Sequence, residues 1–126
     1  MSLAAIFLRT VPTLAVIAAT LCHAAASQAP QPRTVEIEAE RFSFSPSRIK
    51  LTEGEEIDIV LRSADTAHGF KVEGTDISIE IPKRGKGEVV VRYQASKAGR
   101  FKYECNRMCG AGHHFMRGEI VVEARE

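Results

Sequence analysis

The sequence predicts an all-β protein, and specifically an antiparallel Greek-key β-sandwich of seven or eight strands. Three observations lead to this fold class. Apolar and polar residues alternate with a period of two over most of the chain after residue 34, as they do in strands with one buried face. Short segments rich in Gly, Pro and Ser separate these alternating stretches. No segment has the periodicity of a long amphipathic helix, so the strands must bury their apolar faces against another sheet.

Composition limits the size of the domain and the class of partner. The chain has 126 residues, with 17 Lys and Arg against 16 Asp and Glu, and a formal net charge of +1. This length fits one domain. A balanced charge argues against a nucleic-acid binder that works through a basic face, and equally against an acidic disordered tail. We therefore expect no nucleic-acid partner.

Residues 1–26 predict a secretory signal peptide. They contain no acidic residue and a single base, Arg9, followed by an apolar run over 11–21 and the small residues 24–26. We expect cleavage after Ala26 and a periplasmic or other extracytoplasmic location. The alternative is an uncleaved anchor, because residues 10–26 approach the roughly 20 residues that a membrane-spanning helix needs. Membrane association is expected only in that case.

The rest of the chain divides into a linker and a folded domain. Residues 27–33 include Pro30 and Pro32 and predict a short extended linker, so the domain covers 34–126. Its first strand is expected at 35–40, where Val35, Ile37 and Ala39 alternate with glutamates. The later strands are expected at 48–51, 57–62, 68–72, 77–81, 88–93, 100–105 and 118–123. Six aromatic residues should supply much of the core: Phe42, Phe44, Phe70, Tyr93, Phe101 and Tyr103.

One loop between the last two expected strands carries most of the soft metal donors of the domain. Its donors are Cys105, Met108, Cys109, His113, His114 and Met116. Thiolate, imidazole and thioether together are the ligands of soft, redox-active copper rather than of calcium or magnesium. Gly110 and Gly112 should let this loop fold tightly. His68 begins an expected strand after a polar turn, and it can reach the same end because loops gather at the ends of a sandwich.

The pattern C-x3-C-x3-H-x2-M, with an upstream D-x-x-H-x-F, resembles the binuclear copper (CuA) domain of subunit II of heme-copper cytochrome c oxidases, a cupredoxin fold. The resemblance covers about 34–123 and implies two copper ions. Many family members have Glu where this chain has Arg107, but the implied ligand there is a main-chain oxygen. The implied ligands are the bridging thiolates of Cys105 and Cys109, one imidazole each from His68 and His113, the weakly bound thioether of Met116 and the backbone carbonyl of Arg107.

This resemblance implies transfer of single electrons. The domain would have no catalytic site of its own, and it would receive electrons within a cytochrome c oxidase if it assembles into one. The implied partner is a redox protein such as cytochrome c or a terminal oxidase subunit. Family oxidases often take electrons through a Trp near the copper, but this chain has no Trp, so electrons must cross the exposed rim of the site. Asp65 would orient His68, although an ordinary turn cap is an equal alternative.

Several alternatives remain open on the sequence alone. The domain could be a copper-handling chaperone or storage protein that delivers copper to an oxidase. It could be a mononuclear blue-copper carrier, which would leave Cys105 without a role. A disulfide between Cys105 and Cys109 in a structural sandwich, or a zinc site, would leave Met116 unexplained. We further expect His114 to face solvent or lie beside the ligands, and Met108 to contribute packing.

Overall fold

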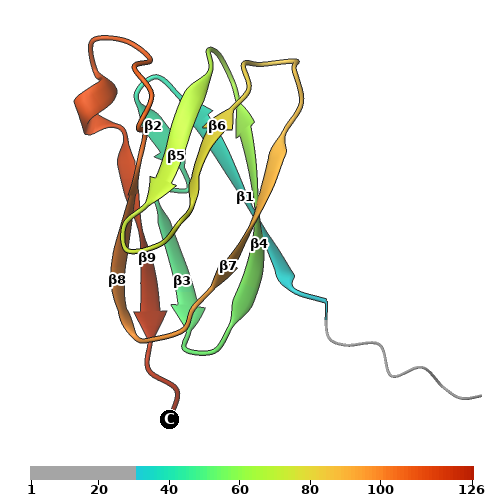
Figure 1. Cartoon of the computed structure of the whole chain (residues 1–126), viewed down its shortest axis with the longest axis vertical. Coiled ribbons are helices and arrows are strands. Elements are labelled where there is room, and N and C mark those ends of the chain that lie inside the picture. Colours follow the sequence, from blue (N-terminus) through green and yellow to red (C-terminus); the bar gives the residue numbers. More distant parts are fainter. Residues whose placement is uncertain (1–30) are drawn as a thin grey trace, which may run out of the picture.

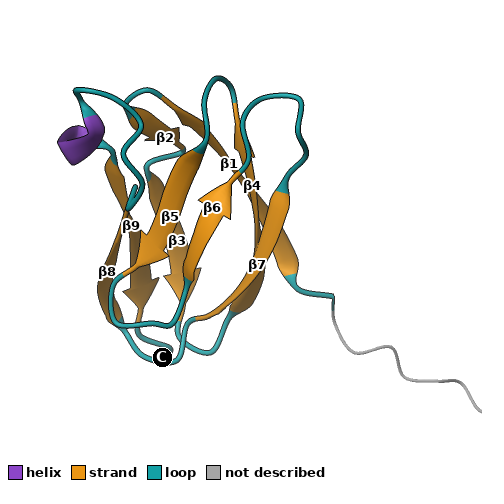
Figure 2. Ribbon diagram, turned by 45° about the horizontal axis from the view of Figure 1, so that its top comes forward, coloured by secondary structure: helices purple, strands orange, loops and turns teal. Residues whose placement is uncertain are grey.

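The computed structural model describes residues 31–126, and the expected signal peptide lies outside the described residues. Two packed sheets make up the domain (Figures 1 and 2). The first sheet runs in the order β2 (Ser43–Ser45), β1 (Arg33–Glu40), β4 (Glu56–Ser63), β7 (Val89–Gln94). The second runs in the order β3 (Arg48–Thr52), β9 (Arg117–Glu123), β8 (Gly99–Glu104), β5 (His68–Val72), β6 (Ser78–Ile81). A short 3-10 helix, η1 (His113–Phe115), lies between β8 and β9.

The predicted all-β sandwich is confirmed, with nine strands in the described part of the chain. The additional strand is β2, which pairs with β1 after a tight turn. Both sheets are mixed, because β1 pairs with β4 in parallel and β3 pairs with β9 in parallel. Alternation of apolar and polar residues reports which face of a strand is buried and not which way its neighbour runs. The strand pattern therefore did not predict these parallel pairs.

The core lies between the two sheets and follows the period-two pattern. On β4, Ile57, Ile59 and Leu61 are fully buried, whereas their neighbours on the same strand are partly exposed. Each such side chain contributes about 1.5–3 kcal/mol by leaving water. Four of the six expected aromatic residues are buried, and Phe42 and Phe101 pack against the core from its margin. The rings of Phe44, Phe70 and Tyr103 contact one another with centroids 5.1–5.8 Å apart.

The same alternation directs two metal donors inward at one end of the sandwich. Phe70 and Val72 face the core from β5, so His68, two residues before Phe70, faces inward as well. On β8, Tyr103 faces the core, and Cys105 continues that inner face just beyond the strand. Lys71 and Val72 at the end of β5 pair with Glu104 and Tyr103 at the end of β8, so this antiparallel register places the start of β5 beside the residues that follow β8. His68 and Cys105 therefore meet where β5 begins and β8 ends. This end of the two strands is uppermost in Figure 1.

Candidate metal centre

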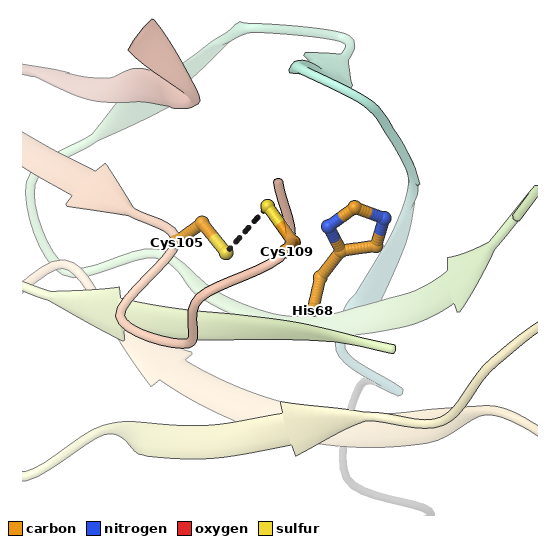
Figure 3. A group of neighbouring side chains, drawn as sticks. All are labelled: His68, Cys105 and Cys109. Carbon is orange, nitrogen blue, oxygen red and sulfur yellow. Dashed lines mark hydrogen bonds between the residues drawn. The ribbon is translucent and has the colours of Figure 1, made fainter. Parts of the chain in front are cut away.

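Cys105 and Cys109 face each other in the loop of residues 105–116 between β8 and β9, which we call the donor loop (Figure 3). Their sulfur atoms are 3.7 Å apart, and both thiols are free. The N–H of Gly69 donates to Cys105 Sγ at 3.3 Å, and the Cys105 thiol donates to the carbonyl of Arg107 at 3.1 Å. Burial and the neighbouring Cys105 raise the pKa of Cys109 to about 11. A bound metal cation would offset this effect, because a coordinating thiol is deprotonated by the metal.

His68 supplies a third donor to this pair. Its side chain is wholly buried, and its Nε2–H donates to Asp65 Oδ1 at 2.7 Å. The other ring nitrogen, Nδ1, is buried without a hydrogen-bond partner among the described residues. An unpaired buried polar atom costs about 1–3 kcal/mol, and a bound metal would remove that cost. The donor atoms of His68, Cys105 and Cys109 all lie within 4.8 Å of one another, so these residues fit a metal ion.

Asp65 holds the imidazole of His68 in place. Burial opposes ionisation of its carboxyl group, but hydrogen bonds from His68 and from the backbone N–H groups of Arg41 and Thr66 outweigh this and lower its pKa to about 2. Asp65 is therefore a carboxylate near neutral pH. An acceptor of this kind keeps the proton of His68 on Nε2 and leaves the lone pair of Nδ1 directed at the thiols.

His113 and Met116 lie on the Cys109 side of the thiol pair. His113 Nδ1 is 3.8 Å from Cys109 Sγ, and Met116 Sδ is 3.9 Å from the same sulfur. The 3-10 helix brings them there, because His113 N–H donates to the carbonyl of Gly110 and Met116 N–H donates to that of His113. A hydrogen bond from Cys105 N–H to the carbonyl of Met116, 3.0 Å, closes the loop. The structure thus brings all six residues of the expected ligand set to one end of the sandwich.

The rim of the loop is apolar and exposed. Met108 is 72% exposed and Phe115 is 78% exposed. The expectation that Met108 contributes packing was wrong, because the segment between the two cysteines turns outward and carries this side chain into solvent. His114 is exposed, as expected.

The turn between β1 and β2 holds two residues that the sequence did not identify as part of the site. Arg41 Nε donates to the carbonyl of Cys109 at 2.8 Å. The ring of Phe42 lies against the loop, so that a Cβ at Gly112 would overlap Phe42 Cδ2. Gly112 has a φ of −91° and is needed for this close approach, whereas Gly110, with a φ of +146°, is needed for its backbone conformation. In the sequence, only Gly110 and Gly112 indicated a close approach at this point of the loop, and they do not show that Phe42 is the residue that approaches.

This donor set suits a soft, redox-active metal. Two thiols, two imidazoles and a thioether lie together at one end of the sandwich. The fold and the site therefore define the protein as a β-sandwich with a binding site for a soft metal. A family model described as a cupredoxin-like domain matches residues 13–122. The chain belongs to the cupredoxin-like family.

Relatives and solved structures agree with this assignment. The chain is 41% identical over 95 residues to cytochrome c oxidase subunit 2 of Thermus thermophilus, a match that covers 75% of this chain and 68% of that relative. A second cytochrome c oxidase subunit 2 of Thermus thermophilus has the same identity, and the match there covers 55% of the relative. A heme-copper terminal oxidase dimer has a chain with a TM-score of 0.60 and 29% identity, covering 72% of this chain and 65% of that one. The periplasmic domain of subunit II of cytochrome oxidase from Bradyrhizobium japonicum shares the fold, with a TM-score of 0.66, 16% identity, and coverage of 77% and 88%.

Family membership and similarity to oxidase subunit 2 support copper as the metal and a terminal oxidase as the context. Helices long and apolar enough to cross a membrane are absent from residues 31–126.

Proposed function

We propose that this chain is an exported copper protein that transfers single electrons through a binuclear CuA-type site. One observation carries the proposal. Two buried thiol sulfurs lie 3.7 Å apart, a ring nitrogen of His68 lies within 4.8 Å of them, and His113 and Met116 lie against Cys109. A mononuclear site would need only one of these thiols. Two facing thiols with further donors around them suit two metal ions.

Each residue has a defined part in this proposal. Cys105 and Cys109 would bind both metal ions, and His68 and His113 would each bind one. The thioether of Met116 and the carbonyl of Arg107, which lies beside Cys105 Sγ, would complete the set as weak ligands. Copper held in this way supplies a one-electron redox couple. The buried thiols, His68 and Met116 exclude water from the centre, which keeps solvent rearrangement during electron transfer small.

The exposed rim is the side from which a redox partner would approach. Met108, His114 and Phe115 are exposed residues of the loop that carries the buried donors, and no Trp is present in the chain to offer another aromatic route. The partner would be a redox protein such as cytochrome c or a terminal oxidase subunit. Similarity to subunit 2 of Thermus thermophilus cytochrome c oxidase supports the oxidase context.

Residues 1–26 would act as a signal peptide and 27–33 as a linker to the domain, placing the metal centre outside the cytoplasm. The fold shared with a periplasmic domain of oxidase subunit II agrees with that location. The mass of the exported protein tests cleavage directly. A mass that includes residues 1–26 would instead indicate an anchored protein.

The decisive experiment is reconstitution of the exported protein with copper, followed by metal analysis and EPR spectroscopy. We expect two copper ions per chain and hyperfine structure from one electron shared over both nuclei. Cys105→Ser should abolish the shared-electron signal, whereas Met108→Leu on the exposed rim should preserve it. One copper ion with a mononuclear spectrum would replace the proposal with a blue-copper carrier. One Cu(I) ion that cannot be oxidised reversibly would replace it with a copper-handling protein.

A further inference from the structure

Arg41 contacts both segments that carry metal donors, although it supplies no donor itself. It lies in the turn between β1 and β2. Its backbone N–H donates to Asp65 Oδ2 at 3.1 Å, and its side-chain Nε donates to the carbonyl of Cys109 at 2.8 Å. Asp65 in turn holds His68 through a hydrogen bond of 2.7 Å. A continuous chain of hydrogen bonds therefore runs from the Cys109 carbonyl through Arg41 and Asp65 to His68.

We propose that Arg41 is a positioning residue that locks the two donor-bearing segments together and places a permanent positive charge beside Cys109. This inference rests on the proposed copper site. In that site the His68 segment and the Cys109 segment must keep a fixed separation, and the strand ladders do not fix it, because Asp65 and Cys109 both lie in loops. Arg41 connects these two loops directly.

The neighbourhood of Arg41 explains how a largely exposed side chain can hold a loop. The next residue, Phe42, packs its ring against Gly110 and Gly112, so the turn between β1 and β2 contacts the donor loop through a second residue. A guanidinium group is planar and always charged, and its hydrogen bond to a carbonyl is charge-assisted. Arg107, in the segment between the two cysteines, is by contrast paired with Glu80 on β6. Asp65 is a nearby anion, and it accepts a hydrogen bond from the backbone N–H of Arg41 rather than from its guanidinium group.

The charge of Arg41 has a consequence for electron transfer. Loss of one electron leaves the metal centre with one more positive charge, and a fixed cation nearby disfavours that oxidised state. Arg41 should therefore raise the reduction potential of the centre. Because the residue is exposed, salt should weaken this effect.

Two measurements on the exported protein test this role, with the variants Arg41→Met and Arg41→Lys. The first is the reduction potential of the copper-loaded protein. The second is amide hydrogen exchange in the copper-free protein at His113 and Met116, whose N–H groups bond within the loop. Arg41→Met should lower the potential and speed exchange about five-fold, as expected for the loss of one hydrogen bond. Arg41→Lys should restore the potential, because it restores the charge, and recover the exchange protection only in part.

Arg100→Gln is the matched control. It removes the same charge from β8, where Arg100 is 71% exposed and lies at the far end of the strand from Cys105. It should change neither measurement. Equal potentials in wild type and Arg41→Met, or equal exchange rates, would overturn the inference. If wild type shows no reversible couple, the proposed function fails, and the exchange rates of the copper-free protein alone decide whether Arg41 positions the loop.

Discussion

The Nε2–H of His68 donates to the Asp65 carboxylate at 2.7 Å, and this contact determines which imidazole nitrogen faces the two thiols. Asp65 remains ionised because hydrogen bonds hold its pKa at about 2. The imidazole bonds to this carboxylate through Nε2 and presents Nδ1, which is buried and unpaired among the described residues. Ionised Asp65 thus orients the imidazole of His68 for metal binding in the metal-free protein.

Replacing Asp65 by Asn should weaken copper binding. The amide cannot hold the Nε2 proton as a carboxylate does, and loss of such an orienting partner typically costs 10–100-fold in metal affinity. The copper-free protein should also lose about 1–3 kcal/mol of stability. Competition with a copper chelator and urea unfolding measure the two effects. Asp58→Asn is the control, because Asp58 forms an exposed ion pair with Arg92 on the outer face of β4. Equal losses of affinity in both variants would contradict the orienting role.

Replacing Gly112 by Ala should destabilise the protein by about 1–3 kcal/mol, because the new Cβ would overlap the ring of Phe42. Phe42→Ala removes the obstacle. The double variant should therefore lose less stability than the sum of the two single changes. Denaturant unfolding of the four proteins gives the coupling energy. Strict additivity would show that the Phe42 ring does not press against this glycine.

Replacing Met116 by Leu separates a ligand role from a packing role. Met116 is 1% exposed, and a Leu of similar volume should change stability by less than about 1.5 kcal/mol. The potential and the absorption spectrum of the copper-loaded protein should nevertheless shift, because the thioether beside Cys109 is lost. Met108→Leu at the 72% exposed rim should alter none of these quantities. An unchanged spectrum in Met116→Leu would show that Met116 packs in the core and does not bind the metal.

Stability should fall at alkaline pH through the two tyrosines, in addition to the Cys109 thiol, whose pKa burial and Cys105 raise to about 11. Burial raises the pKa of Tyr103 far above its ordinary value of 10.0, and burial raises that of Tyr93 as well. A raised folded-state pKa means that the contribution is complete below pH 10 and is lost as the pH rises above it. Unfolding free energies measured on both sides of pH 10 should show this decline. In Tyr103→Phe the decline should be smaller, at the cost of about 1 kcal/mol for the lost hydrogen bond to the Pro46 carbonyl. An equal decline in both proteins would assign the effect to other groups.

The sequence was informative where a local pattern decides the outcome. The period of two placed the strands, and it also directed His68 and Cys105 to the interior, because each continues the buried face of its strand. The spacing of Cys105, Cys109, His113 and Met116 within one loop made their convergence predictable. These residues need only a tight turn to meet, and Gly110 supplies it with its positive φ.

The sequence was uninformative where contacts join distant segments. The role of Arg41 depends on the β1–β2 turn lying across a loop that comes 68 residues later, and no local pattern encodes that approach. The parallel pairs β1–β4 and β3–β9 were missed for the same reason. Met108 was misassigned because its apolar character suggested burial, whereas its position on the outside of the loop decides its exposure.

The parallel pair β3–β9 joins segments that are far apart in the sequence. Arg48 lies beside Glu119 across this pair, 71 residues away in the sequence, and β9 also pairs with β8, the strand that leads into the donor loop. The donor set likewise joins distant segments, because His68 at the start of β5 meets Cys105 and Cys109 beyond the end of β8. Long-range pairing of this kind is slow compared with hairpin formation. The complete donor set is therefore expected only after these long-range pairs have formed, and an unfolded chain offers no assembled site to a metal ion.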